Sequence, residues 1–232
     1  MEESELVFEY FRRRPNGFFV EVGANHPTRR SQTWFLEQQG WRGLLVEPNP
    51  VLCEELRTDR PNSRVFEMAL GSSREVGEAD LHLAVADGHS ALRPQVGTAL
   101  SGKTIRVGVQ TLDWVMEQAA PKELDFVSID VEGMELEVLH GFDLCRWRPK
   151  LLVIEDMFVN HQKHRYLRNS EYKLVRRTGY NNWYVPKETP VSLFSASTLR
   201  ELVRLGRKFW VNPSYEAVRR KWKARRAAGQ AQ

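Results

Sequence analysis

Residues 17–50 decide the fold, and their sequence is GFFVEVGANHPTRRSQTWFLEQQGWRGLLVEPNP. A short apolar run at 18–22 stops at a glycine turn, and a second apolar run at 43–47 ends in an acid followed by a proline. Between them, residues 31–39 have helical character and Gly40 closes the segment. Parallel strands need a crossover of about a dozen residues or more, which this spacing supplies. Short continuous apolar runs are typical of strands buried on both faces. The stretch therefore predicts a strand–helix–strand unit of an α/β sheet.

The two strand ends carry the candidate ligand-binding residues. In an open α/β sheet, ligands bind at the carboxyl ends of the strands. Gly23 leaves room for a ligand to approach the backbone, and Glu47 lies at the interval at which an acid accepts hydrogen bonds from ribose hydroxyls. The predicted cofactor contacts at these ends are Glu21, Gly23, Ala24, Asn25, Glu47 and Pro48.

The turn departs from the dinucleotide-binding fingerprint G-x-G-x-x-G. Gly23 is the one glycine of the three that is present, so a ligand with a ribose and no pyrophosphate fits better. S-adenosylmethionine is such a ligand. The alternative is that a lone glycine after a strand simply makes a turn, which is the commoner case.

The composition indicates the number of domains and the cellular compartment. The chain has 232 residues, 41% of them hydrophobic, which favours one α/β domain with an appendage. The two cysteines, Cys53 and Cys145, show no metal spacing and favour a reducing compartment, so we expect a cytoplasmic protein. The acidic start at residues 1–5 is unlike a signal peptide, and no apolar run approaches the length of a membrane span, about 18 residues.

The rest of the chain continues the alternation of helices and strands. The predicted helices are 5–14, 51–57, 111–119 and 135–140, and the predicted strands are 64–70, 124–130, 150–156 and a closing hairpin of 172–178 with 183–186. Alternating segments at 79–86 and 104–110 indicate an antiparallel β insertion at about residues 72–110. Its loop at 88–92 is expected to overhang the ligand site, with Ser90 as a contact. The lone His89 in that loop is more often a surface residue than a catalyst.

Carboxylates end four of the predicted strands: Glu21, Glu47, Asp130, and the neighbours Glu155 and Asp156. Gathered at one edge of one sheet, these acids repel each other. A bound cationic group, a metal or a base for proton removal would relieve the repulsion. A magnesium ion held by Asp130, Glu155 and Asp156 is one such arrangement, since hard oxygens suit this metal.

The chain resembles the FkbM-type methyltransferases over roughly residues 15–186. The match rests above all on DFVSIDVEGMELEVLHGFD at 125–143, with further pieces at 19–25, 31–50, 148–156 and 171–185. The resemblance implies a class I, Rossmann-like methyltransferase that depends on S-adenosylmethionine. Its expected fold is a mainly parallel seven-stranded sheet with an antiparallel final hairpin. Such enzymes commonly methylate hydroxyls of sugars or of small natural products.

The resemblance also implies roles for individual residues. By position in the family, residues 21–25 would hold the methionine end of the cofactor and Glu47 the ribose. Asp130 would face the methionine moiety or the acceptor. The backbone at Ala69 and Leu70 would lie beside the adenine; a plain strand end is the alternative.

These observations predict O-methylation of a hydroxyl on a sugar or glycoconjugate. The acceptor must lose a proton, and the candidate bases are Asp130 and His161, although a solvated helix start is the alternative for His161. Ser128 stands where many members of the family have a lysine, so a positive charge is missing from the site rim. Methylation of a small secondary metabolite and an inactive cofactor-binding scaffold are the alternative functions. Three aromatics of the closing hairpin either stack on a sugar or, more commonly, fill the core: Tyr180, Trp183 and Tyr184.

Residues 187–232 lie outside the resemblance and are predicted to form a helical, basic extension of a methyltransferase domain at 1–186. The segment 219–226 concentrates positive charge in a chain whose net charge is +4 and whose pI is about 9.1. A solvated helix end is the simplest explanation. Contact with an anionic membrane or a lipid-linked glycan is the alternative, which would make the protein membrane-peripheral. Nucleic acid is not an expected partner, because no RNA-binding module is evident.

Overall fold

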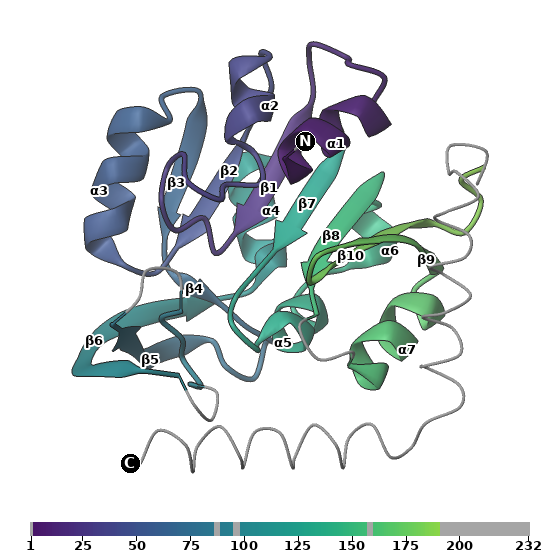
Figure 1. Cartoon of the computed structure of the whole chain (residues 1–232). Helices are drawn as coiled ribbons and strands as arrows, with labels where there is room; N and C mark the ends of the chain where they lie inside the picture. Colours follow the sequence, from purple (N-terminus) through teal and green to yellow (C-terminus); the bar gives the residue numbers. More distant parts are fainter. Residues whose placement is uncertain (1, 86–88, 95–97, 157–159, 191–232) are drawn as a thin grey trace.

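The chain builds a mainly parallel sheet with helices on both of its faces (Figure 1). The structure is a computed structural model that describes residues 2–85, 89–94, 98–156 and 160–190. Seven strands follow the order β3-β2-β1-β7-β8-β10-β9, and β10 runs antiparallel to both of its neighbours. The strands are β1 (Phe18–Val22), β2 (Arg42–Glu47), β3 (Ser63–Glu67), β7 (Phe126–Ile129), β8 (Leu151–Glu155), β9 (Tyr172–Thr178) and β10 (Asn181–Pro186). This arrangement confirms the predicted α/β fold with its antiparallel closing hairpin.

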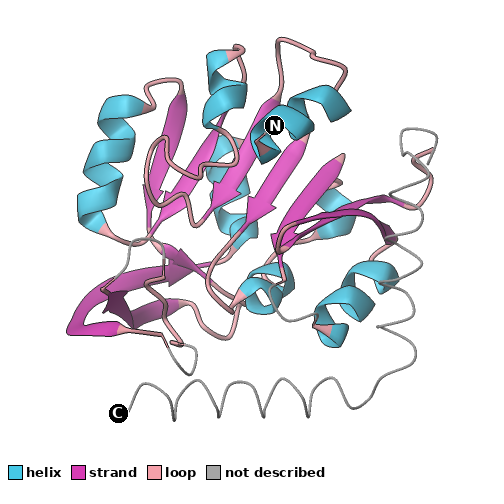
Figure 2. Ribbon diagram, in the orientation of Figure 1, coloured by secondary structure: helices cyan, strands magenta, loops and turns pink. Residues whose placement is uncertain are grey.

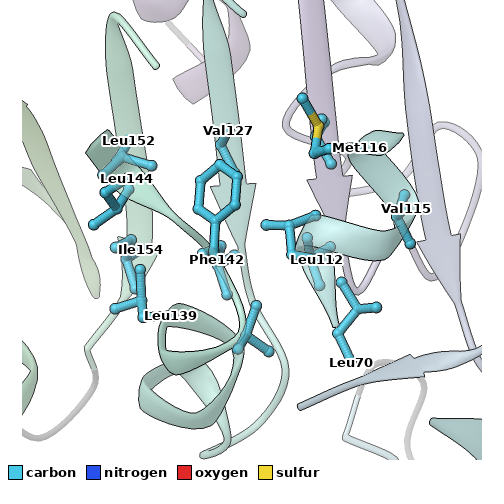
Figure 3. Close-up of a cluster of buried hydrophobic side chains, with 14 of the residues drawn as sticks. Leu70, Leu112, Val115, Met116, Val127, Leu139, Phe142, Leu144, Leu152 and Ile154 are labelled. Carbon is cyan, nitrogen blue, oxygen red and sulfur yellow. The ribbon is translucent and has the colours of Figure 1, made fainter. Parts of the chain in front are cut away.

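Two separate layers of helices cover the sheet. One face carries α1 (Glu3–Tyr10), α2 (Trp34–Gln38) and α3 (Pro50–Asp59), whose apolar side chains share one buried cluster with alternate strand residues such as Phe19. The other face carries α4 (Leu112–Ala119), α5 (Glu135–His140), α6 (Leu144–Trp147) and α7 (His161–Asn169). Figure 3 shows Leu112, Val115 and Met116 of α4 in this second cluster. Because successive strand side chains point to opposite faces and both faces are covered, the strands are continuous apolar runs.

Local signals fix most of the helix ends. The side chain of Thr111 accepts a hydrogen bond from the backbone N–H of Trp114 and caps α4, as predicted. Asn49 caps α3 in the same way through Val51. The first helix differs from its predicted range of 5–14: α1 spans Glu3–Tyr10, so residues 11–14 lie beyond its end. Arg12 and Arg13 have left-handed backbone angles, φ 54° and 55°, which no helix can continue.

The third predicted strand, 64–70, is wrong as a single element. Strand β3 ends at Glu67, and Ala69–Leu70 forms β4, which pairs with β6 (Leu100–Gln110) in a separate three-stranded sheet completed by β5 (Gly77–Ala84). The reason is the length of the neighbouring strand, since the last pair between β2 and β3 joins Glu47 to Glu67. Beyond that pair β3 has no partner left in the main sheet.

The antiparallel insertion is confirmed as the pair β5–β6. In Figure 2 this small sheet lies beside the arrowheads of the main sheet, at the edge where the parallel strands end. Within the described ranges, none of the helices combines the length and apolarity needed to cross a bilayer. The predicted basic extension falls almost wholly on residues 191–232, outside the described part of the chain.

Candidate functional site

A pocket opens at the carboxyl edge of β1 and β2, between the main sheet and the insertion. The turn after β1 contributes Gly23 and Asn25, and the end of β2 contributes Glu47 and Pro48. The opposite wall comes from β4, from β5 and from the insertion loop, and includes Met68, Ala69, Leu70, Leu81, Ser90, Ala91 and Leu92. The end of β7 closes the pocket with Asp130 and Glu132. We call this the first pocket.

Glu47 is held rigidly at the floor of the first pocket. One carboxylate oxygen accepts from the backbone N–H of Asn25 and the other from that of Asn49, each at 2.9 Å. Burial raises the pKa of Glu47 to about 7, and these two hydrogen bonds oppose the rise. A carboxylate oxygen has two lone pairs, so each oxygen keeps one for a ligand hydroxyl. The acid is therefore oriented by the backbone and remains able to bind a diol.

Gly23 is required by the fold itself. Its φ of +81° belongs to the left-handed region, and a Cβ on this residue would lie 1.8 Å from the backbone oxygen of Asp130. The turn after β1 thus rests against the end of β7, whether or not a ligand is bound. Ala24 is 3% exposed, packs in the core under α1 and α2, and does not line the first pocket. Of these two predicted cofactor contacts, Gly23 lines the first pocket and Ala24 does not.

Glu21 does not line the first pocket either, because its carboxylate holds the loop that follows β1. It accepts from the backbone N–H of Gln32 at 2.6 Å and from the hydroxyls of Ser31 and Thr33 at 2.9 and 2.5 Å. The guanidinium of Arg60, which is fully buried, lies 3.9 Å away. Burial raises the pKa of Glu21, while Arg60 and the hydrogen bonds lower it. Glu21 as a cofactor contact stays a prediction that no direct contact supports.

The insertion loop borders the first pocket, as expected from its sequence. Ser90 lines the pocket, and its hydroxyl accepts from the backbone N–H of Ala84 at 3.2 Å. His89 contacts a residue that lines the pocket: its Nδ1 lies 2.8 Å from a carboxylate oxygen of Glu132. Arg93 adds a second tie to the core through Glu137 at 3.3 Å. These pairs fix the loop across the pocket, at the end of β7.

A second pocket adjoins the first at the end of β7. Asp130 and Glu155 line it from the ends of β7 and β8, and Tyr180 and Asn181 line it from the turn between β9 and β10. Helix α1 supplies Glu3 and Leu6 to its wall, a contribution that the sequence did not predict. Among the described residues, Asp130 alone lines both pockets.

Asp130 and Glu155 stand side by side at the carboxyl edge. Ile129 pairs with Ile154 in the sheet, so the two acids follow one position further on adjacent strands, which lie about 4.8 Å apart. Burial, with repulsion from nearby carboxylates, raises the pKa of Asp130 to about 7. Burial and the charge of Asp130 raise the pKa of Glu155 to about 9. The two acids therefore hold at least one proton at neutral pH.

Asp156 has a different environment from its neighbour Glu155. It accepts from the backbone N–H of Asn160 and from the side-chain amide of Asn182, both at 2.9 Å. Lys163 of α7, 2% exposed, places its Nζ 3.3 Å from Asp156 and 3.2 Å from Glu135. The same ammonium also donates to the backbone oxygen of Glu155. Lys163 shares a helix face with the buried Leu167, and that spacing was the signal in the sequence that could have identified it.

The predicted magnesium site is wrong. No group of three His, Cys, Asp or Glu side chains within the described ranges is arranged to hold a metal ion. Both oxygens of Asp156 are already used by Asn160, Asn182 and Lys163. A buried lysine supplies the positive charge that the sequence argument had assigned to the ion. We call Glu21, Glu135 and Asp156 the paired acids, because each faces Arg60 or Lys163, and we call Asp130 and Glu155 the open acids.

The remaining predicted site residues are one histidine and three aromatic residues, and they differ in whether they line a pocket. His161 is the first residue of α7 and is not among the residues that line either pocket, so its role as a base stays a prediction without a geometric argument. Trp183 and Tyr184 are 0% and 1% exposed and fill the core, as the commoner alternative predicted. Tyr180 is 60% exposed and lines the second pocket, so among these aromatics it is the one available to an acceptor.

The first pocket suits an adenosyl ligand. An oriented carboxylate with free lone pairs matches the two hydroxyls of a ribose, and the apolar walls at Met68, Leu70 and Leu81 match a purine. Asp130, at the far end, offers negative charge to a sulfonium. Nothing in the lining resembles a glycine-rich pyrophosphate cradle, which agrees with the choice of S-adenosylmethionine over a dinucleotide.

Solved structures with similar folds include several methyltransferases. A TehB-like SAM-dependent methyltransferase from Corynebacterium glutamicum is 12% identical, covers 80% of this chain and 88% of its own, and has a TM-score of 0.44. A methyltransferase from Geobacter sulfurreducens is 11% identical, with coverages of 79% and 77% and a TM-score of 0.43. A protein in the NADB-Rossmann superfamily from Streptococcus agalactiae is 12% identical, with coverages of 98% and 94% and a TM-score of 0.45. A search of curated proteins gave no significant match.

The sequence itself gives the decisive comparison. The family description "Methyltransferase FkbM domain" matches residues 21–181. This range runs from β1 to the first residue of β10 and contains Glu47, Asp130 and Glu155 of the two pockets. The match spans well over half of the 232 residues. The chain therefore belongs to the FkbM methyltransferase family, whose members depend on S-adenosylmethionine.

Proposed function

We propose that the protein transfers the methyl group of S-adenosylmethionine to a hydroxyl of a sugar or glycoconjugate. The first pocket would hold the donor and the second the acceptor. The observation that carries the proposal is that Asp130 lines both pockets. A residue at such a junction is within reach of the donor's reactive end and of the acceptor's hydroxyl together.

The donor would be held by residues of the first pocket. Glu47 would bind the ribose through its two oriented oxygens, and the walls at Ala69 and Leu70 would contact the adenine. Asn25 and Ser90 would complete the pocket from the turn after β1 and from the insertion loop. When bound, S-adenosylmethionine supplies an electrophilic methyl group on a sulfonium, and the protein chiefly orients the partners for in-line displacement.

The lining of the second pocket favours a hydroxylated acceptor. The carboxyl group of Glu155 has no partner among the described residues and can bond to a ligand, and the ring of Tyr180 offers an exposed apolar face of the kind on which sugars stack. The Thr178 hydroxyl and the Asn181 amide already donate to Glu3, so the argument does not depend on them. An apolar secondary metabolite would leave Glu155 without a partner, which costs binding energy. The polar lining is the reason to prefer a carbohydrate over the alternative acceptor.

Asp130 is the proposed general base. A base works best when its pKa lies near the working pH, and burial raises the pKa of Asp130 to about 7. It would accept the proton of the acceptor hydroxyl as the oxygen attacks the methyl carbon. As the new C–O bond forms, the S–CH₃ bond breaks and its electron pair goes to sulfur, which becomes a neutral thioether. S-adenosylhomocysteine and the methyl ether then leave the site, and Asp130 gives its proton to solvent.

The test is the substitution Asp130→Asn, followed with labelled S-adenosylmethionine and an extract of glycans as the acceptor source. We expect turnover to fall by roughly 10²- to 10⁴-fold, the usual contribution of a general base, with donor binding retained within about tenfold. Glu117→Gln is the control, because Glu117 lies on α4 and pairs with the exposed Arg146. Near-normal turnover in Asp130→Asn would contradict the assigned role. A wild-type protein that binds no donor would favour the inactive scaffold.

A further inference from the structure

The charges at the carboxyl edge do not balance. The paired acids face Arg60 or Lys163, and Glu132 faces His89. No described residue forms an ion pair or a hydrogen bond with the carboxylate of Asp130 or of Glu155. Glu47 and Glu3 also lack a cation, but their carboxylates accept hydrogen bonds from neutral donors. Among the described acids that line the two pockets, the open acids are thus the ones with neither a cation nor a hydrogen-bond donor, and they lie where the two pockets meet.

Glu155 carries the argument beyond a simple acidic cluster. It is 9% exposed, and its carboxylate lines the second pocket without a partner among the described residues. Leaving an ionised carboxylate buried and unpaired is costly, so such a group takes up a proton or faces a cation. The ammonium of Lys163 forms ion pairs with Glu135 and Asp156 and donates a hydrogen bond to the backbone oxygen of Glu155, so it does not pair with the Glu155 carboxylate.

We propose that Asp130 and Glu155 together form a recognition site for an organic cation at the junction of the two pockets. This inference rests on the proposed function and adds to it that the group bound between the two pockets carries a positive charge. Two sources supply such a cation: the sulfonium of the donor, or an ammonium group on an aminated acceptor. The described acids do not form a group of three metal ligands, which favours an organic cation over a metal ion.

The open acids exchange a proton for the cation. Their burial raises both pKa values, so a proton occupies the site while it is empty of ligand. When a cation enters, its charge lowers these pKa values and up to one proton leaves, so the charge of the site is conserved. S-adenosylhomocysteine has the same α-ammonium and α-carboxylate as the donor but lacks the sulfonium charge, so it gains nothing from an exchange that depends on the sulfonium. If the donor is the source, the site therefore favours the charged substrate over the neutral product and promotes product release.

The first experiment measures the donor arm. Calorimetry gives the Kd of S-adenosylmethionine and of S-adenosylhomocysteine for wild type, Glu155→Gln and Glu117→Gln. Glu117 is the matched control, since it carries the same charge, pairs with Arg146 on the surface and lines neither pocket. If the donor's sulfonium is the cation, the ratio of the two Kd values falls about fivefold or more in Glu155→Gln and stays constant in Glu117→Gln. Comparing two ligands on one variant cancels any general loss of binding.

The second experiment measures the acceptor arm. Ethanolammonium and its neutral analogue ethylene glycol are titrated into the ¹⁵N-labelled protein, free and in complex with S-adenosylhomocysteine. If the acceptor carries the cation, ethanolammonium alone shifts the amides of Glu155, Tyr180 and Asn181, and the shifts disappear in Glu155→Gln. The donor ratio of the first experiment then stays unchanged.

The outcomes are distinguishable. A change in the donor ratio or in the ammonium titration supports the cation site and identifies its source. If Glu155→Gln changes neither, the cation site is overturned. If neither S-adenosylmethionine nor S-adenosylhomocysteine binds, the proposed function fails. The titration of the free protein with ethanolammonium still decides the cation site in that case.

Discussion

The paired acids and the open acids differ in what their carboxylates contact, although all of them except Glu135, which begins α5, come from the strand ends of one sheet. Asp156, a paired acid, uses both oxygens on Asn160, Asn182 and Lys163, and so holds the start of α7 against β8 and β10. Glu155 precedes it in the chain and leaves its carboxylate facing the second pocket. Two neighbouring carboxylates thus have different roles: that of Asp156 holds a helix against the sheet, and that of Glu155 faces a pocket.

The difference is set by elements far away in sequence. Arg60, which faces Glu21, follows the end of α3, and its guanidinium also pairs with Glu37 at 2.6 Å. Lys163 comes from the face of α7 that packs on the sheet. Neither cation reaches Asp130 or Glu155 as a salt-bridge partner. An acid at a strand end is therefore a candidate for ligand chemistry only after its partners from the helices have been counted.

The largest predicted effect is the loss of a cation that serves the paired acids. Lys163→Met keeps much of the side-chain length and leaves Asp156 and Glu135 without their shared ammonium. Removing one partner of a buried ion pair costs about 3–5 kcal/mol, so we expect urea unfolding to show a loss of that size.

The control for this variant is Lys187→Met, whose partner Glu171 is exposed. Exposed pairs contribute about 0–1 kcal/mol. Equal losses in the two variants would mean that the buried ammonium does not stabilise the paired acids, and the distinction between the two groups of acids would collapse.

A smaller effect is expected at Glu47, which belongs to neither group because two backbone amides orient it. In Glu47→Gln the side-chain NH₂ replaces one acceptor oxygen, so one backbone N–H and one ribose hydroxyl lose their partner. We expect the Kd of S-adenosylmethionine to rise about tenfold, or roughly 1.4 kcal/mol, by calorimetry. Glu67→Gln is the matched control: Glu67 ends the adjacent strand, pairs with the exposed Arg57 and does not line the first pocket. A similar loss in both variants would remove Glu47 from the ribose site.

Much of the framework was predictable because it depends on local pattern. The run at 18–22 and the helix at 135–140 were predicted with the bounds that the structure shows for β1 and α5. The convergence of acids also followed from the sequence, since parallel strands end at one edge. Strand 64–70 failed because its pattern continues past Glu67 while its partner β2 stops at Glu47, and a strand's own sequence does not show where its neighbour ends.

The candidate site was less predictable, because contacts between distant residues decide it. Glu21 and Asp130 look equivalent in sequence, as acids that end apolar runs. Arg60 and the hydroxyl of Thr33 convert the first into a framework residue. The contribution of α1 to the second pocket has no sequence signal at Glu3 that separates it from an ordinary acidic helix start. The magnesium hypothesis failed for the same reason, since it assigned to an ion the charge that Lys163 supplies.

The open acids should make stability depend on pH. The folded-state pKa of Glu155 is raised to about 9, by burial first and then by the charges of Asp130, Glu135 and Glu132, while Lys163 lowers it. A carboxyl group with a raised folded pKa stabilises the fold at low pH and loses that contribution as the pH rises through the folded value. Each pH unit below the folded pKa changes the stability by about 1.4 kcal/mol. Between pH 7 and about 9.5 the wild type should therefore lose roughly 2–3 kcal/mol relative to Glu155→Gln, or about 4–12 °C in Tm at this size.

Parallel thermal melts of the two proteins across this pH range measure the effect. The difference between them cancels the groups that titrate in both. If the difference in Tm between wild type and Glu155→Gln stays constant across this pH range, Glu155 has an ordinary pKa in the folded protein. The open acids would then destabilise the fold no more than the paired acids do.

The smallest predicted effect is a fraction of a proton. With the pKa of Asp130 raised to about 7, this carboxyl is about half protonated at pH 7 in the free protein. A sulfonium beside it lowers that pKa, so binding of S-adenosylmethionine should release a fraction of a proton, whereas S-adenosylhomocysteine, which lacks the sulfonium, should release less. Calorimetry in phosphate and in Tris measures the difference, because released protons add the ionisation heat of the buffer. The contradicting result is a change in binding heat between phosphate and Tris that is the same for both ligands. It would mean that the donor's sulfonium lies away from Asp130, which would leave the ammonium of an acceptor as the cation that the open acids recognise.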